Sequence, residues 1–229
     1  MTPLVLLSGM MCDARLFGPQ IAAFGGRALH LAPLVGASSI QAMAAQILAE
    51  APPRFALAGL SMGGIVAMEV IAQAPARVER LALLDTNPCT ELPEVQARRA
   101  PQIARVLAGG LTEVMRDEMK PNYLTDGPDR DAILALCMEM ACALGPQVFA
   151  NQSRALRDRP DQQDTLRLVA VPTLVLCGRG DVLCPVERHE LMHRLIPHST
   201  LHIVENAGHL PTLEQPFDTT AALARWLEA

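Results

Sequence analysis

Aromatic residues are scarce in this sequence, and its excess of acidic over basic residues does not favour a polyanionic partner. Aromatic side chains make up 3% of the 229 residues, with one Trp and one Tyr, so platforms on which nucleic-acid bases stack are missing. The 19 basic and 24 acidic residues give a net charge of −5, whereas nucleic-acid binding normally needs a basic face. We therefore expect no nucleic-acid partner.

Long apolar runs and metal-binding cysteine patterns are also missing. No run approaches the ~20 apolar residues that a membrane-spanning helix requires. The apolar start of the chain has neither a basic segment nor a cleavage-like site, so no signal peptide is expected. The six cysteines contain no Cys-x-x-Cys pair. These absences predict a cytoplasmic protein with reduced thiols, no metal, no cofactor and no membrane partner, and they leave its oligomeric state open.

What the sequence does contain is an alternation of short apolar runs and helical patterns. Half of the residues are hydrophobic, and a chain of this length favours one globular domain. Repeated strand–helix units predict an α/β fold with a mostly parallel six-stranded sheet and helices on both faces. The expected strands are 4–7, 27–34, 55–58, 81–84, 173–177 and 200–204. The expected helices of this core are 15–24, 39–51, 62–74, 186–195 and 217–227.

The alternation stops between Asn87 and about Leu168. Helical patterns at 95–107, 111–119 and 132–144 are separated there by proline or glycine. We expect residues 1–87 and 169–229 to form the α/β core. Residues 88–168 would form a helical lid, inserted after the fourth strand, over the carboxyl ends of the strands where open parallel sheets place their sites.

The strongest local signal is Gly59-Leu60-Ser61-Met62-Gly63, which lies directly between an expected strand and an expected helix. A turn this tight strains its central residue, and the flanking glycines remove side chains that would collide. The serine hydroxyl would then stand above the sheet, in front of a helix N-terminus. This context predicts that Ser61 is a nucleophile.

A serine needs a base, and His209 is the best placed of six histidines, in a loop just past the last strand. The pair His189 and His193 is expected on a solvated helix face instead. Asp181, which follows the fifth strand, is the expected carboxylate partner of the histidine. Asp85, at the end of the fourth strand, is the alternative.

An acyl-transfer site also needs donors for the oxyanion that develops on the substrate carbonyl. The backbone N–H of Met62, directly after the serine, is one expected donor. The other is the N–H of Met10, in the loop after the first strand. The alternative for that loop is a plain turn at Gly9.

The residues Ser61, Asp181 and His209, in that order, resemble the α/β-hydrolase superfamily over nearly the whole chain. The resemblance implies that fold and a catalytic triad of these three residues. Two departures stand out. The chain starts almost at the first parallel strand, which implies a sheet lacking the N-terminal hairpin of many members. It also has Ser8-Gly9 where members often carry His-Gly.

These features predict a serine hydrolase of small carboxylic esters that works through an acyl-enzyme. The alternatives are the same triad used for carbon–carbon bond hydrolysis, lactone hydrolysis or perhydrolysis, or a non-catalytic ligand receptor. Methionines of the lid, such as Met115, Met119 and Met140, are expected mainly to pack its interior, and an apolar acyl pocket is their alternative role. Arg98 and Arg99 are expected on the solvated surface, and binding of an acidic substrate is their alternative role.

Overall fold

The protein is built around one sheet of six parallel strands. The computed structural model describes residues 1–229 and gives the strand order β2-β1-β3-β4-β5-β6, with every neighbouring pair parallel. The predicted α/β fold with a parallel six-stranded sheet is thereby confirmed. The strands are β1 (Leu4–Leu7), β2 (Leu29–Ala32), β3 (Phe55–Leu60), β4 (Val78–Leu84), β5 (Thr173–Gly178) and β6 (Thr200–Val204).

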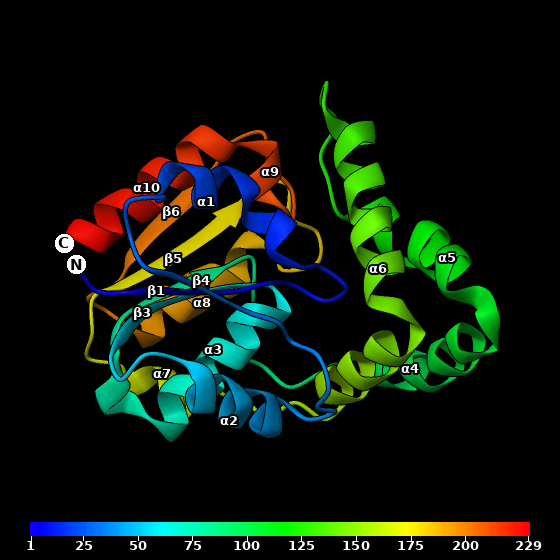
Figure 1. The fold of residues 1–229 in the computed structure, drawn as a ribbon, viewed down its shortest axis with the longest axis horizontal. Coiled ribbons are helices and arrows are strands. Elements are labelled where there is room, and N and C mark those ends of the chain that lie inside the picture. The colour runs from blue at the N-terminus through cyan, green and yellow to red at the C-terminus, as the bar shows by residue number, and fades with distance from the viewer.

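The central strands are mostly apolar because helices cover both faces of the sheet. All residues of β1, β3 and β5 are buried, whereas the edge strands β2 and β6 are partly exposed. Figure 1 shows α2 (Ile40–Glu50), α3 (Met62–Gln73) and α8 (Val186–Leu195) on one face. The other face carries α1 (Gly18–Ala23), α9 (Pro211–Glu214) and α10 (Pro216–Glu228). Each face has its own hydrophobic core.

Local sequence signals explain several helix ends. The Ser39 side chain accepts a hydrogen bond from the Ala42 N–H and begins α2, while α8 and β6 have the predicted bounds. Strand β2 is shorter than the predicted 27–34, since only Leu29–Ala32 pairs with β1. The short α9 was not predicted, because four residues carry no periodic pattern.

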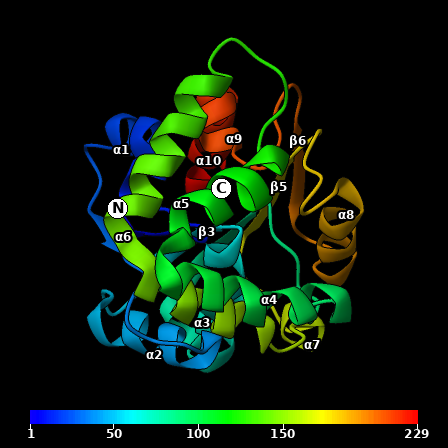
Figure 2. The ribbon, with the colours of Figure 1, turned by 90° about the vertical axis from the view of Figure 1, so that its right-hand side faces the viewer.

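A helical region follows β4 and packs at the carboxyl edge of the sheet (Figures 1 and 2). It comprises α4 (Pro93–Arg105), a wider turn at Val106–Gly110, α5 (Leu111–Glu113), two further turns over Val114–Met119 and Lys120–Asn122, and α6 (Arg130–Arg157). The fold therefore has the helical lid that was predicted as part of its class. Helix α7 (Gln163–Arg167) packs instead against α3 and α8.

Helix α6 is longer than the predicted 132–144 because it continues beyond a kink. Gly145 has φ 82°, outside the helical range, and the chain turns back into a helix at Pro146. By length and composition alone α6 could cross a membrane, with a mean hydropathy of 1.7 over its most apolar window. Charged residues and the Gly145-Pro146 pair interrupt this stretch, so the sequence contains no long uninterrupted apolar run here.

Candidate active site

Ser61 stands on a sharp turn between β3 and α3. Its backbone has φ 55° and ψ −117°, a left-handed conformation that a residue with a side chain rarely adopts. The turn is possible because glycines allow the neighbouring backbones to touch. A Cβ on Gly63 would lie 2.0 Å from the Leu7 carbonyl oxygen, and one on Gly59 would lie 2.2 Å from that of Gly63. The backbone therefore raises the Ser61 side chain to the carboxyl edge of the sheet.

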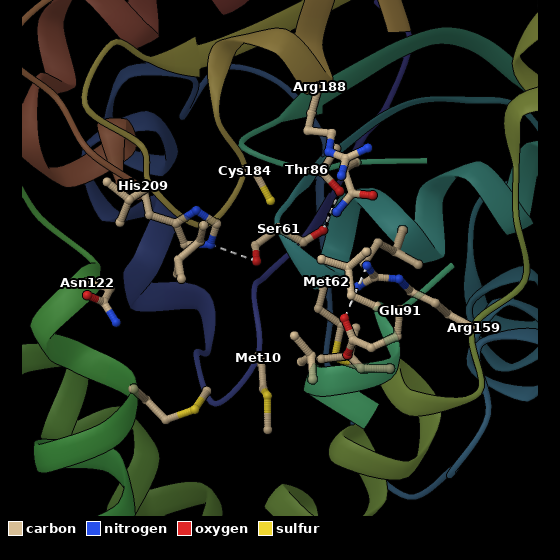
Figure 3. A pocket seen from close by; sticks show the side chains of 18 of the residues that line it. Met10, Ser61, Met62, Thr86, Glu91, Asn122, Arg159, Cys184, Arg188 and His209 are labelled. Atoms are coloured by element: carbon tan, nitrogen blue, oxygen red, sulfur yellow. Dashed lines mark hydrogen bonds and ion pairs between the residues drawn. The ribbon is translucent and has the colours of Figure 1, made fainter. Parts of the chain in front are cut away.

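His209 and Asp181 reach the same edge from two other loops. The His209 Nε2 lies 2.8 Å from the Ser61 Oγ, and its Nδ1 lies 2.8 Å from the Asp181 Oδ2 (Figure 3 shows the contact to Ser61). Asp181 follows β5 and His209 follows β6, so parallel strands bring them together. Both side chains are almost fully buried. The three residues that the sequence singled out thus form one unbroken chain of hydrogen bonds.

The charge on Asp181 determines which way these hydrogen bonds run. Burial alone would raise the pKa of its carboxyl, but the attraction of His209, its hydrogen bond and two backbone amides outweigh this and lower the pKa. Those amides belong to Leu183 and Cys184 and donate to Oδ1. An ionised Asp181 accepts a hydrogen bond from the N–H at His209 Nδ1 and so keeps the proton on that nitrogen. The Nε2 atom is then free to accept the Ser61 hydroxyl proton, as a general base must.

Asp85, the alternative carboxylate, makes no hydrogen bond to His209. Its Oδ1 accepts the Gly178 N–H, and its buried Oδ2 has no partner. Burial and the nearby charge of Asp181 raise the pKa of Asp85 well above its usual range, which favours its protonated form. Two carboxyl groups lie at this edge, and only that of Asp181 is in contact with the imidazole.

The backbone amides expected to hold an oxyanion lie beside Ser61. Met10 and Met62 both line the pocket that contains Ser61, and the Met10 amide donates to no group of the protein. The loop is anchored by Gln152 of α6, whose side chain accepts the Met11 N–H and donates to the Leu34 carbonyl. Sequence reasoning missed Gln152, because nothing in a helical pattern marks a residue that supports a distant loop.

Glu214 is a second residue that sequence reasoning missed. Its carboxylate accepts the N–H groups of Gly208 and Leu210, on either side of His209, and also the N–H and hydroxyl of Thr125. The His209 N–H donates to the Tyr123 carbonyl at 2.7 Å. The histidine loop is therefore held to residues 123–125 of the helical region.

His189 contradicts the expectation of a solvated helix face. It is completely buried, its Nε2 accepts the Thr86 N–H, and its Nδ1 contacts the Pro185 carbonyl. Burial lowers its pKa to about 4. The ring is neutral in the folded protein and supports the backbone next to Asp85. The neighbouring His193 is half-buried against Ser199.

This buried imidazole predicts a loss of stability in mild acid. The unfolded chain takes up a proton at His189 as pH falls below about 6.5, whereas the folded protein takes it up only near 4. The free energy of unfolding should therefore fall as pH is lowered between these values, by up to about 1.4 kcal/mol per pH unit. Urea denaturation of the wild type and His189→Gln at pH 7 and pH 5 measures this. Equal pH dependence of the two proteins would contradict it.

Asp181, Cys184 and His209 also form a group of metal-ligand types, with donor atoms within 4.8 Å of one another. The Asp181 and His209 atoms are already hydrogen-bonded to each other, and His209 Nε2 contacts Ser61. Asp181 Oδ1 is occupied by two amides. The donor set is therefore already engaged in the serine–histidine–aspartate chain.

A pocket of about 470 Å³ opens over Ser61 between the sheet edge and the helical region (Figure 3). Met119 lines it, whereas Met115 and Met140 are buried in the cores, as expected for packing residues. Arg99 is buried in its wall and pairs with Glu91, so its predicted place on the solvated surface is wrong. The burial of Arg99 could not be predicted from the sequence, because its partner Glu91 lies eight residues away and the pair forms no periodic pattern.

A parallel sheet with a strained serine turn between β3 and α3, and with a histidine and an aspartate after the last two strands, is the arrangement typical of the α/β-hydrolase class. The model of the alpha/beta hydrolase family matches residues 9–223. The chain belongs to this family, and it is a hydrolase.

Individual relatives point the same way. The chain is 28% identical to a pimeloyl-[acyl-carrier protein] methyl ester esterase of Salmonella newport (strain SL254), over 93% of this chain and 89% of that protein. A malate-bound thermophilic esterase from Thermogutta terrifontis is 28% identical with a TM-score of 0.90, covering 100% of this chain and 90% of the other. The enol-lactonase of Burkholderia xenovorans LB400 has a TM-score of 0.89 at 20% identity, covering 100% and 92%, and shares the fold.

Proposed function

We propose that this hydrolase cleaves small carboxylic esters, with Ser61 as nucleophile, His209 as base and Asp181 as the carboxylate that orients the histidine. The observation that carries the proposal is the pair of 2.8 Å contacts that link Ser61 to His209 and His209 to Asp181. The similarity to two esterases at 28% identity supports an ester as the substrate.

In the proposed reaction His209 takes the Ser61 proton as the oxygen attacks the ester carbonyl. The amides of Met10 and Met62 hold the oxyanion of the tetrahedral intermediate. The imidazolium, stabilised by Asp181, then protonates the departing alcohol and leaves an acyl group on Ser61. Water, activated by the same histidine, releases the acid and restores the serine.

We also propose the division of the chain that the sequence predicts, with a core of residues 1–87 and 169–229 and a lid within 88–168. The pocket over Ser61 is lined from both parts, which supports a lid that closes the site. Helix α7 lies within residues 88–168, but its contacts with α3 and α8 group it with the core. The six cysteines are unpaired, in keeping with the proposed cytoplasmic location.

Covalent labelling of the serine tests this proposal. A fluorophosphonate should add once per chain and block hydrolysis of p-nitrophenyl acetate, because the base and oxyanion donors activate Ser61. Tryptic cleavage after Arg54 and Arg77 releases peptide 55–77, in which Ser61 is the only residue with a hydroxyl or thiol. Mass spectrometry of that peptide measures the reaction. An unlabelled peptide and no ester hydrolysis would favour a ligand receptor on the same fold.

A further inference from the structure

One wall of the pocket carries more positive charge than its acidic side chains balance. Arg99, Arg159 and Arg188 line this wall together with a single buried carboxylate, that of Glu91. The Glu91 Oε2 lies 2.7 Å from the Arg99 Nη2, and its Oε1 lies 3.2 Å from the Arg159 Nη2. Arg188 forms no ion pair, and its one side-chain hydrogen bond goes to the Cys89 sulfur at 3.3 Å. The wall thus holds three guanidinium groups against one carboxylate.

No other acid offsets the two remaining positive charges. Both oxygens of Asp181 are occupied by His209 and two amides, and Asp85 accepts the Gly178 N–H and does not line the pocket. Glu118, elsewhere in the pocket, pairs with Arg105 and Gln102. Partly buried positive charge without a counter-ion costs free energy, since the protein replaces water around it. An anionic ligand group between these arginines would remove that cost.

The two arginines with unused donors face the reacting serine. In Figure 3 Arg188 extends from α8 toward Thr86 and Ser61, and the Arg159 guanidinium reaches inward above Glu91. The guanidinium group binds carboxylates through paired N–H donors, and it stays charged when buried. A pocket of about 470 Å³ holds both Ser61 and these arginines, so one small molecule can reach both.

We propose that the substrate is an ester that also carries a carboxylate, such as a half-ester of a short dicarboxylic acid, and that Arg188 with Arg159 binds this carboxylate. The inference rests on the proposed function and narrows its substrate class. Arg188 then determines specificity without taking part in the chemistry. It should act chiefly through KM, because a remote charge is held equally in the ground state and the transition state.

Matched pairs of esters test this proposal. The wild type should hydrolyse monomethyl succinate, glutarate or adipate with a kcat/KM at least about tenfold above that of the dimethyl ester, although the diester offers two cleavable groups. Acetoxyacetate, with its carboxylate on the alcohol side, shows which side of the ester the arginines hold. Inorganic phosphate and succinate, compared as competitive inhibitors of half-ester hydrolysis, serve as the phosphate arm, and stronger inhibition by phosphate than by succinate would overturn the choice of carboxylate.

Arg188→Gln should reduce the half-ester to diester ratio of kcat/KM about tenfold or more, mainly through a higher KM, and Arg188→Lys should restore part of it. Arg194→Gln is the matched control, because it removes the same charge from an exposed site on the same helix, outside the pocket. Equal ratios in the wild type and Arg188→Gln, or an equal fall in Arg194→Gln, would overturn the inference. Neutral p-nitrophenyl acetate separates the two proposals. If it is cleaved through Ser61 while the half-ester preference is absent, the substrate class fails and the hydrolase function stands.

Discussion

Replacing Ser61 by alanine is expected to lower kcat for ester hydrolysis by roughly 10⁴- to 10⁶-fold. The Oγ atom is the group that would bond to the carbonyl carbon, and no other hydroxyl lies on the His209 Nε2. Steady-state and single-turnover assays with p-nitrophenyl acetate measure the loss. The variant should stay folded, because the Ser61 hydroxyl makes no hydrogen bond apart from that to His209.

The control is Ser38→Ala, which removes an exposed serine outside the pocket and should keep full activity. Thermal unfolding of both variants shows whether the fold is intact. Residual activity of Ser61→Ala above about one-tenth of the wild type would mean that another group is the nucleophile. In that case the hydrogen-bond chain would have a structural role only.

Replacing Asp181 by asparagine is expected to have the second large effect and to lower kcat by about 10⁴-fold. An amide at this position presents an N–H₂ or a neutral oxygen to His209 Nδ1. It favours the wrong tautomer and leaves the imidazolium without its counter-charge. Measuring kcat across pH 6–9 tests this, because a lost counter-charge should also move the pH at which activity rises.

Asp85→Asn is the matched control for that prediction. The Asp85 Oδ1 accepts the Gly178 N–H, which an asparagine oxygen can also do, and Asp85 makes no hydrogen bond to His209. We expect kcat to change by less than about tenfold. If Asp85→Asn proves as damaging as Asp181→Asn, the two carboxylates share the role. If Asp181→Asn is mild and Asp85→Asn severe, the assignment is reversed.

Much of the fold could be predicted because its signals are local. Strands buried on both faces, such as β1 and β3, are short runs without a polar side chain, so the sequence marks them clearly. Ser61 lies in Gly59-Leu60-Ser61-Met62-Gly63, between an apolar run and a helical pattern, and this context predicts a tight turn from a strand into a helix. His209 and Asp181 follow strands, so the parallel topology alone brings them to one edge.

The rest depends on contacts between distant residues. Asp85 and Asp181 each follow a strand, so the sequence alone does not say which of them partners the histidine. In the structure only Asp181 accepts the amides of Leu183 and Cys184 and contacts His209. His189 is buried because its ring accepts an N–H from Thr86, which lies 103 residues away. Arg159 joins Glu91 in the same way. Hydrogen-bond partners of this kind leave no periodic pattern.

The Glu214 carboxylate joins Thr125 to the loop that carries His209, and the His209 N–H joins the same loop to the Tyr123 carbonyl. If the whole helical region lifted away as one rigid body, it would break these hydrogen bonds and draw the imidazole off Ser61. While the helical region was displaced to admit an ester, His209 would not be in position to accept the Ser61 proton. In the proposed mechanism, the closed position of residues 123–125 therefore helps to keep His209 in contact with Ser61.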